Sequence, residues 1–480
     1  MARSGNESQR RSWRPFLLGL GLVVLSFFFA FIVCPAFGED PISFKLPPFE
    51  KRTLGNGLTV YLMERHEVPL IRVSLVFRAG AAKDGDRSGL AYLTVENLFS
   101  GTKGFSKRRM EGLLESLGAS YETYIDHDSA GVDLSFLSGD QDRVFPLLKE
   151  AAQAAVFPRA EFERRKKRLL LELKQEKERP AEVIEAYFRK FLFGRHGYGN
   201  PLYGLPSTVK KISSREAAAF YRTHYRPDEA ALIVVGDFQT PAMEEKVRKL
   251  FGTWRVKKGR PLFKAVPLPV HRTSRVLLVN KRDAQETTFI IGTIGLPMHH
   301  PAYAAARVVH TILGGRFSSW LNEALRVEGG LTYGVESYVE PYQSSGLFAV
   351  SSFTATEDTV RAVDLVLENL ERFDRQGVDA ETLSSAKRYL IGRFPARFET
   401  LGDLADWLAL VFIFGLDETY AEDFLRKVEG VTAEDCRKVM AEHWARERLQ
   451  MVFIGPGKAL RDRVKKYGRL FEKDIREEGY

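Results

Sequence analysis

SGLAYLTVENLFSGT, residues 88–102, is the stretch around which the rest of the chain is organised. A helix is expected to begin at about Gly89. The flanking sequence predicts strands where apolar residues alternate or run together, and helices where they recur every three or four positions. These elements, which predict an α+β fold, are strands at 58–63, 71–77, 119–124 and 131–137, a helix near 107–117 and long helices through 161–179.

The frame of the stretch resembles the active-site helix of the insulinase/pitrilysin family of zinc peptidases, which typically reads G-[LI]-A-H-F-L-E-H-M-L-F-x-G-T. In that family two His at i and i+4 stand one above the other and bind zinc, while the Glu serves as general base. The resemblance implies two sheets packed with helices and arranged as a clam shell. The residues in register are Gly89, Ala91, Leu98, Phe99, Gly101 and Thr102.

The residues that carry the family's chemistry differ in this chain. Tyr92 and Glu96 hold the two His positions, and Val95 holds the position of the base. A neutral phenol with a reference pKa of about 10 is a poor zinc ligand near pH 7, and an isopropyl group cannot take a proton from water. Glu172, 76 positions beyond Glu96, matches the family's third ligand. One remaining carboxylate does not make a zinc site, so no metal is expected here.

The N-terminus is typical of an export signal. Arg10, Arg11 and Arg14 precede an apolar run at 16–33, and Ala36-x-Gly38 is an acceptable cleavage site. Residues 1–38 are therefore predicted to be a signal peptide. An uncleaved membrane anchor stays open, because the run approaches the roughly 20 residues that span a bilayer. Both alternatives place the chain in the periplasm or another extracytoplasmic space, and the second would anchor it to the inner membrane. After cleavage Cys436 is the single remaining cysteine, which permits no internal disulfide.

Charge argues against a nucleic-acid partner. The full chain of 480 residues has a net charge of +9, but residues 1–38 hold four arginines and one glutamate, which leaves +6 for the remainder. That surplus is mild and dispersed. The run Arg164-Arg165-Lys166-Lys167-Arg168 could suggest an anionic ligand, although a solvated helix face is the favoured interpretation.

An internal repeat divides the chain. Arg52-Thr53 recurs at Arg272-Thr273 and Phe193-Gly194 at Phe414-Gly415, and further pairs keep the spacing between 219 and 221 residues. We therefore expect two homologous domains at 45–255 and 271–470. The basic stretch at 256–270 is the expected linker.

The second domain carries a block that the resemblance marks as functional. The loop at 313–321 resembles the family's L-G-G-x-x-S-S-x-L, which implies substrate-binding roles for Gly314 and Gly315. Arg326 and Tyr333 keep the seven-residue spacing of the family's Arg/Tyr pair, which faces the zinc site. A phenol aimed at the developing oxyanion stabilises the transition state, and a guanidinium can hold the substrate backbone. The alternative is a core Tyr on a strand and a surface Arg on a helix.

Two further observations bear on the site. None of the nine histidines lies in an H-E-x-x-H or H-x-x-E-H frame, so core or surface positions are expected for all of them. The family's Asn-Ala pair on the strand that lines the cleft is replaced by Glu122-Thr123, which leaves the substrate role of that strand in doubt.

Two functions remain open from sequence. In the first, the chain is the subunit without zinc of an extracytoplasmic heteromeric metallopeptidase, and it supplies Arg326 and Tyr333 to peptides cleaved by a homologous partner with H-x-x-E-H and zinc. In the second, it is an inert scaffold or peptide-binding protein with the same fold. The intact Arg/Tyr block favours the first, because a scaffold has no chemical need for it.

Overall fold

The structure is a computed structural model that describes residues 44–255 and 266–480. The predicted leader at 1–38 and residues 256–265 of the predicted linker lie outside these ranges. Within them, no helix is long and apolar enough to cross a membrane.

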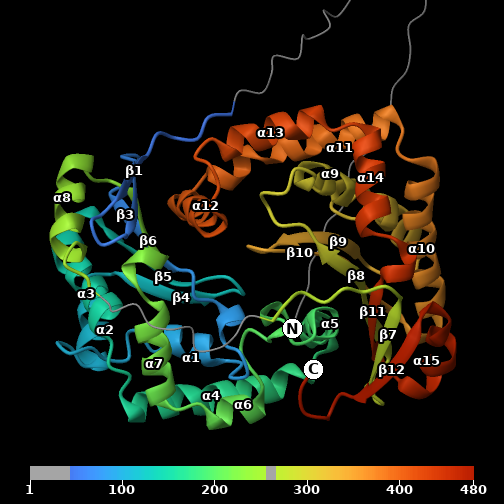
Figure 1. Ribbon diagram of the computed structural model, residues 1–480, viewed down its shortest axis with the longest axis horizontal. Coiled ribbons are helices and arrows are strands. Elements are labelled where there is room, and N and C mark those ends of the chain that lie inside the picture. The colour runs from blue at the N-terminus through green and yellow to red at the C-terminus, as the bar shows by residue number, and fades with distance from the viewer. Residues whose placement is uncertain (1–43, 256–265) are drawn as a thin grey trace, which may run out of the picture. The chain divides into compact units, whose positions relative to one another are not determined.

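The first half contains a six-stranded sheet in the order β1-β2-β6-β3-β5-β4 (Figure 1). β6 pairs with β2 in parallel, and the other pairings are antiparallel. β4 is an edge strand, so one of its sides has no strand partner among the described residues. The strands are β1 (Glu50–Thr53), β2 (Thr59–Glu64), β3 (Leu70–Phe77), β4 (Ser120–Ile125), β5 (Ala130–Leu137) and β6 (Ala230–Gly236).

Helices cover one face of this sheet and enclose the first core. Alternate residues of β3, such as Ile71, Val73 and Leu75, enter that core, as the period of a strand requires. The helices of this half are α1 (Leu90–Glu96), α2 (Lys107–Ser116), α3 (Gln141–Ala154), α4 (Arg159–Glu176), α5 (Pro180–Phe193), α6 (Pro206–Lys211), α7 (Ser214–His224) and α8 (Thr240–Phe251).

The second half contains another six-stranded sheet, in the order β12-β7-β11-β8-β10-β9. Its strands are β7 (Arg275–Asn280), β8 (Glu286–Gly295), β9 (Val335–Pro341), β10 (Gly346–Ala355), β11 (Gln450–Gly455) and β12 (Arg469–Asp474). Its helices are α9 (Tyr303–Leu313), α10 (Thr359–Gln376), α11 (Ala380–Arg393), α12 (Leu401–Phe414), α13 (Tyr420–Gly430), α14 (Ala433–His443) and α15 (Gly457–Val464).

The second sheet repeats the first. Five strands, β2-β6-β3-β5-β4, match β7-β11-β8-β10-β9 in order, and in both sheets the first two are parallel. Only the outer strand differs, since β1 precedes its neighbour in the chain whereas β12 comes from the C-terminus. The predicted α+β class with two helix-covered sheets is confirmed, and the exact domain boundaries stay a prediction.

One helix from each half packs against the sheet of the other half. α5 packs on β8 and β11 of the second sheet, where Tyr187 and Phe188 join a buried cluster with Val279 and Ile290. α12 packs on β3 and β6 of the first sheet, where Leu408 and its apolar neighbours meet the opposite side from the first core (Figure 1). The two helices end at the matching Phe-Gly pairs of the repeat. The exchange is therefore reciprocal.

Candidate functional site

The structure brings Tyr92, Glu96 and Glu172 together, and the guanidinium of Arg165 lies between them. Nε of Arg165 donates to Oε2 of Glu96 at 2.6 Å, and Nη1 donates to Oε2 of Glu172 at 3.2 Å. Nη2 donates to the Tyr92 hydroxyl. Each nitrogen of one guanidinium thus contacts one of the three residues that hold the family's ligand positions. We call these four residues the Arg165 cluster.

The start of α1 is fixed by a buried carboxyl and a glycine. Gly89 has a φ of 95°, and a Cβ there would lie 2.9 Å from the Tyr203 carbonyl oxygen, so only glycine fits. Asp84 accepts hydrogen bonds from the backbone N–H groups of Gly89 and Ala91 at 2.8 and 2.7 Å. Burial raises the pKa of Asp84 to about 8. These contacts set the rotation of the helix, and with it the direction of Tyr92 and Glu96.

The edge strand β4 is tied to the same cluster. The hydroxyl of Thr123 donates to Oε1 of Glu96, so both oxygens of that carboxylate have partners. Burial raises the pKa of Glu96, and the bond from Thr123 offsets part of that rise. Glu122 is exposed and points to the other face of the strand. The two residues of the Glu122-Thr123 departure therefore differ in role: Thr123 contacts the Arg165 cluster through Glu96, and Glu122 does not.

The residues at this position do not fit a zinc ion. Tyr92, Glu96 and Glu172 already bind a permanent cation, and Arg168 also contacts Glu172, at 3.1 Å. Val95 is fully buried in the first core, and its isopropyl group cannot take a proton from water. Across residues 44–255 and 266–480, no group of three or more His, Cys, Asp or Glu side chains is placed to hold a metal.

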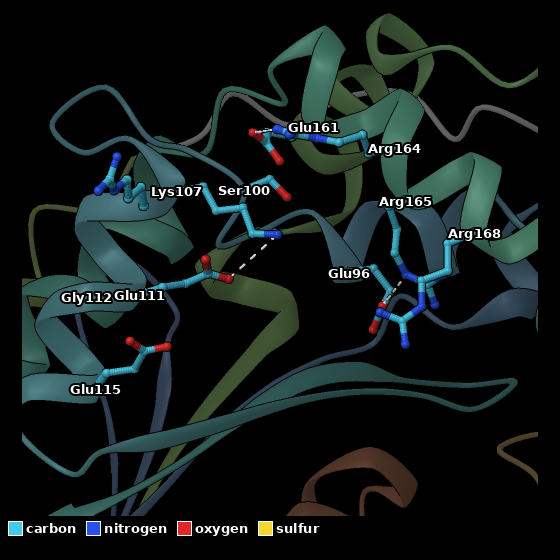
Figure 2. A pocket seen from close by; sticks show the side chains of 11 residues that line it. Glu96, Ser100, Lys107, Glu111, Gly112, Glu115, Glu161, Arg164, Arg165 and Arg168 are labelled. Carbon is cyan, nitrogen blue, oxygen red and sulfur yellow. Dashed lines mark hydrogen bonds and ion pairs between the residues drawn. The ribbon is translucent and has the colours of Figure 1, made fainter.

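The interpretation of residues 164–168 as one solvated face is corrected by the structure. The side chains of Arg164 and Arg168 are 71% and 79% exposed, as expected, but that of Arg165 is only 19% exposed and that of Lys166 is 12% exposed. Five consecutive residues of a helix turn through more than a full circle, so they cannot share one face. Arg165 points to α1 and the site, whereas Arg164 points away and pairs with Glu161 (Figure 2).

A pocket of about 690 Å³ lies beside the Arg165 cluster (Figure 2). Ligand pockets are usually lined mainly by apolar and aromatic side chains. In this pocket most of the lining side chains are charged, and both signs of charge are present. The pocket by itself therefore indicates no ligand class. Its lining is Glu96, Ser100, Lys107, Arg108, Glu111, Gly112, Glu115, Glu161, Arg164, Arg165 and Arg168.

The Arg/Tyr block of the second half is exposed. Arg326 lies in a π-helical turn, η5 (Asn322–Glu328), and its guanidinium is stacked 4.6 Å from the ring centroid of Phe317. Tyr333 lies in the loop before β9 and is 85% exposed. Its hydroxyl makes no hydrogen bond with any residue that the structure describes. The alternative of a core tyrosine on a strand is therefore wrong for Tyr333.

Packing requires the two glycines of the preceding loop. A Cβ on Gly314 would lie 2.5 Å from the backbone nitrogen of Ser337, and one on Gly315 would lie 2.6 Å from Nε2 of His310. The carbonyl of Gly314 accepts from the Ser337 N–H at 3.3 Å, which ties the loop to β9. These contacts explain both glycines without a ligand, and their substrate-binding role stays a prediction.

His310 packs against this loop beside Gly315 and hydrogen-bonds to Ser337 of β9. The Ser337 hydroxyl donates to the His310 carbonyl at 3.0 Å, so Nδ1–H of His310 donates to the same hydroxyl oxygen at 2.9 Å. Burial lowers the pKa of His310 to about 3, and the charge of Arg307 adds to the effect. The native protein therefore needs this imidazole neutral.

Replacement of His310 by asparagine should make the protein less sensitive to acid. Unfolded His310 binds a proton below its ordinary pKa of about 6.5, whereas the folded form does not until about pH 3. The stability held by the neutral imidazole is thus lost as the pH falls below 6.5, by about 2 kcal/mol at pH 5. Urea unfolding of wild type and His310→Asn at pH 7.5 and 5 measures the difference. His299→Asn, at an exposed position, is the control. Equal acid sensitivity of wild type and His310→Asn would contradict the assignment.

Two family models match the chain. One, described as Insulinase (Peptidase family M16), matches residues 59–205, and the other, described as Peptidase M16 inactive domain, matches residues 211–390. Together they cover more than half of the chain. The first range contains Tyr92, Val95, Glu96 and Glu172, and the second contains Arg326 and Tyr333.

Individual relatives are distant and cover most of the chain. A Bacillus subtilis protein named uncharacterized zinc protease YmxG is 21% identical over 73% of this chain and 85% of its own length. A Helicobacter pylori protein named non-peptidase homolog YmxG is 23% identical over 79% of this chain and 88% of its own. The crystal structure of a peptidase M16 inactive domain from Pseudomonas fluorescens has a TM-score of 0.78 and 26% identity, and the match covers 85% of this chain and 98% of that one.

Proposed function

Because the chain belongs to the insulinase (M16) peptidase family, we propose that it is the subunit without zinc of a heteromeric metallopeptidase. A homologous partner chain with the H-x-x-E-H motif would hold the zinc, and this chain would contribute Arg326 and Tyr333 to the cleavage of a peptide or an unfolded protein. From the predicted export signal at residues 1–38, the proposed location is the periplasm or another extracytoplasmic space.

The free hydroxyl of Tyr333 is the observation that carries this proposal. An 85% exposed tyrosine contributes little to the core, and its hydroxyl has no hydrogen-bond partner in the described parts of this chain. It lies seven positions after Arg326, whose guanidinium is positioned by Phe317, itself 70% exposed. Both polar groups are thus available to a molecule outside this half.

The chemistry suits peptide hydrolysis. When a peptide carbonyl is attacked, negative charge grows on its oxygen, and a phenolic O–H placed there stabilises that charge. The fork of donors on Arg326 can hold a carbonyl of the substrate backbone nearby and so fix its orientation. Attack on the carbonyl would be the task of the partner.

An inert scaffold or peptide-binding protein is the second candidate. The observation that favours it is the Arg165 cluster, which fills the ligand positions with a protein cation. Both sheets also end in an edge strand, β4 and β9, and such an edge can pair with an extended peptide without cleaving it.

Metal content and activity separate the candidates. The purified full chain should contain less than about 0.1 zinc ion per chain, since its ligand positions do not fit the metal. It should also not cleave unfolded peptides. A tagged chain captured from native extract under mild conditions should bring down a homologous chain with H-x-x-E-H. The recovered complex should contain zinc and show chelator-sensitive cleavage.

One result would refute the proposal directly. About one tightly bound zinc per chain in the isolated protein, lost on substitution of Glu172, would mean that this chain has its own metal site. Capture of a homologous partner whose complex cleaves no peptide would favour the scaffold.

A further inference from the structure

The Arg165 cluster contains more than an isolated ion pair. Arg165 and Glu172 are seven residues apart on α4, two turns along the same helix face, while Tyr92 and Glu96 are one turn apart on α1. The two helices present these four side chains to each other. We infer that Arg165 is a built-in replacement for the family's metal ion, which holds the ligand positions together and closes them to divalent cations.

The geometry carries this inference. A guanidinium has its donors in a fixed planar fork, and here all three of its nitrogens are used, each on a different residue of the ligand set. The guanidinium also lies 5.0 Å from the centroid of the Tyr92 ring. A surface ion pair would leave some of these donors in water, but the side chains of Arg165 and Glu96 are only 19% and 21% exposed.

Charge gives the reason for a cation at this place. Glu96 and Glu172 are two carboxylates directed at one point, and like charges so placed repel. In the family the position of Glu96 holds a histidine, so the second carboxylate at this point is a feature of this chain. Arg165 brings one positive charge to that point, and Arg168 brings another to the outer side of Glu172. Because an arginine stays protonated at every relevant pH, this cation cannot be removed by a chelator.

The cluster extends to the edge strand through Thr123. The chain of contacts runs from Arg165 to Glu96 and from Glu96 to Thr123 on β4. The two places where this sequence departs from the family frame, the helix motif and the edge strand, are therefore parts of one site. The inference does not depend on the existence of a partner subunit.

Arg165→Met tests the replacement, because methionine keeps much of the apolar stem and removes the charge. The melting temperature in chelator should fall by about 5 °C, since one partner of a mostly buried ion pair is lost. The site then offers two carboxylates and a phenol, oxygen donors that suit Mn²⁺. About 1 mM Mn²⁺ should recover at least half of the lost melting temperature in the variant and should not change that of wild type.

Two matched variants complete the test. Arg164→Met removes the neighbouring, exposed arginine and should leave both the melting temperature and the absence of a Mn²⁺ response unchanged. Glu96→Gln/Arg165→Met removes one charge of each sign. Its melting temperature should be higher than that of Arg165→Met and should not change when Mn²⁺ is added. This double variant also serves if Arg165→Met does not fold. A wild type that responds to Mn²⁺ as strongly as Arg165→Met, or a double variant no more stable than the single one, would overturn the inference.

Discussion

Tyr333→Phe should lower the turnover of the complex reconstituted with the proposed zinc-binding partner by roughly 10²–10³-fold. This is the usual effect of removing one oxyanion donor. The variant should still fold and assemble. The hydroxyl is exposed and bonds to no described residue of this chain, so its loss removes no contact within the fold. Steady-state kinetics on an unfolded peptide, with zinc content and assembly measured on the same samples, would report kcat separately from binding.

Arg326→Ala and a control make this result interpretable. Arg326→Ala should also weaken substrate binding, because the guanidinium that Phe317 positions is lost. Tyr389→Phe removes another phenol from the second half, one whose hydroxyl accepts a hydrogen bond from Nη1 of Arg393 at 3.5 Å, and should leave turnover unchanged. If Tyr333→Phe and Arg326→Ala both assemble and cleave at the wild-type rate, the pair has no catalytic role and the scaffold becomes the better hypothesis.

Restoration of the motif should fail while Arg165 remains. The triple variant Tyr92→His, Val95→Glu, Glu96→His recreates two imidazoles, which with Glu172 form a donor set typical of catalytic zinc. The guanidinium would still lie among them. A positive charge about 4 Å from a metal ion costs about 4 kcal/mol for each charge on the ion at a protein surface, hence about 8 kcal/mol for Zn²⁺, or roughly a millionfold in affinity.

Addition of Arg165→Met to the triple variant should therefore raise zinc affinity by up to roughly that millionfold, as measured by competition with a chelating dye. The triple variant with Arg164→Met is the matched control and should bind as weakly as the triple variant. Tight zinc binding by the triple variant alone would show that Arg165 moves aside. Neither form should become an efficient enzyme, because the contacts that orient metal ligands typically matter about 10–100-fold.

Sequence patterns predicted most of the first site and missed its centre. Tyr92, Glu96 and Glu172 could be placed from the motif frame, because helix spacing and the family's order locate them. In the sequence Arg165 is one of five consecutive charged residues, a pattern that favours a solvated helix face. Its spacing of seven from Glu172 was the signal that could have separated it from Arg164, since i and i+7 share a helix face.

The second half shows a different limit. The spacing of Arg326 and Tyr333 located the block, but whether Tyr333 lies in a core or in solvent depends on the loop before β9. The same holds for α5 and α12. The apolar residues of α5 and α12 predict that each helix packs against another element, but their periodicity does not show which of the two sheets each helix contacts.

The reciprocal exchange of α5 and α12 has a consequence for the order in which the chain can fold. Residues 230–236 complete the first sheet, yet the helix that covers its second face, α12, is not synthesised until residues 401–414. During that interval Tyr61, Val76 and Ile233 have no apolar cover from α12. Contacts between residues so far apart form slowly, and exposed apolar strands aggregate. The nascent first half is thus expected to be a client of chaperones until the last third of the chain has emerged.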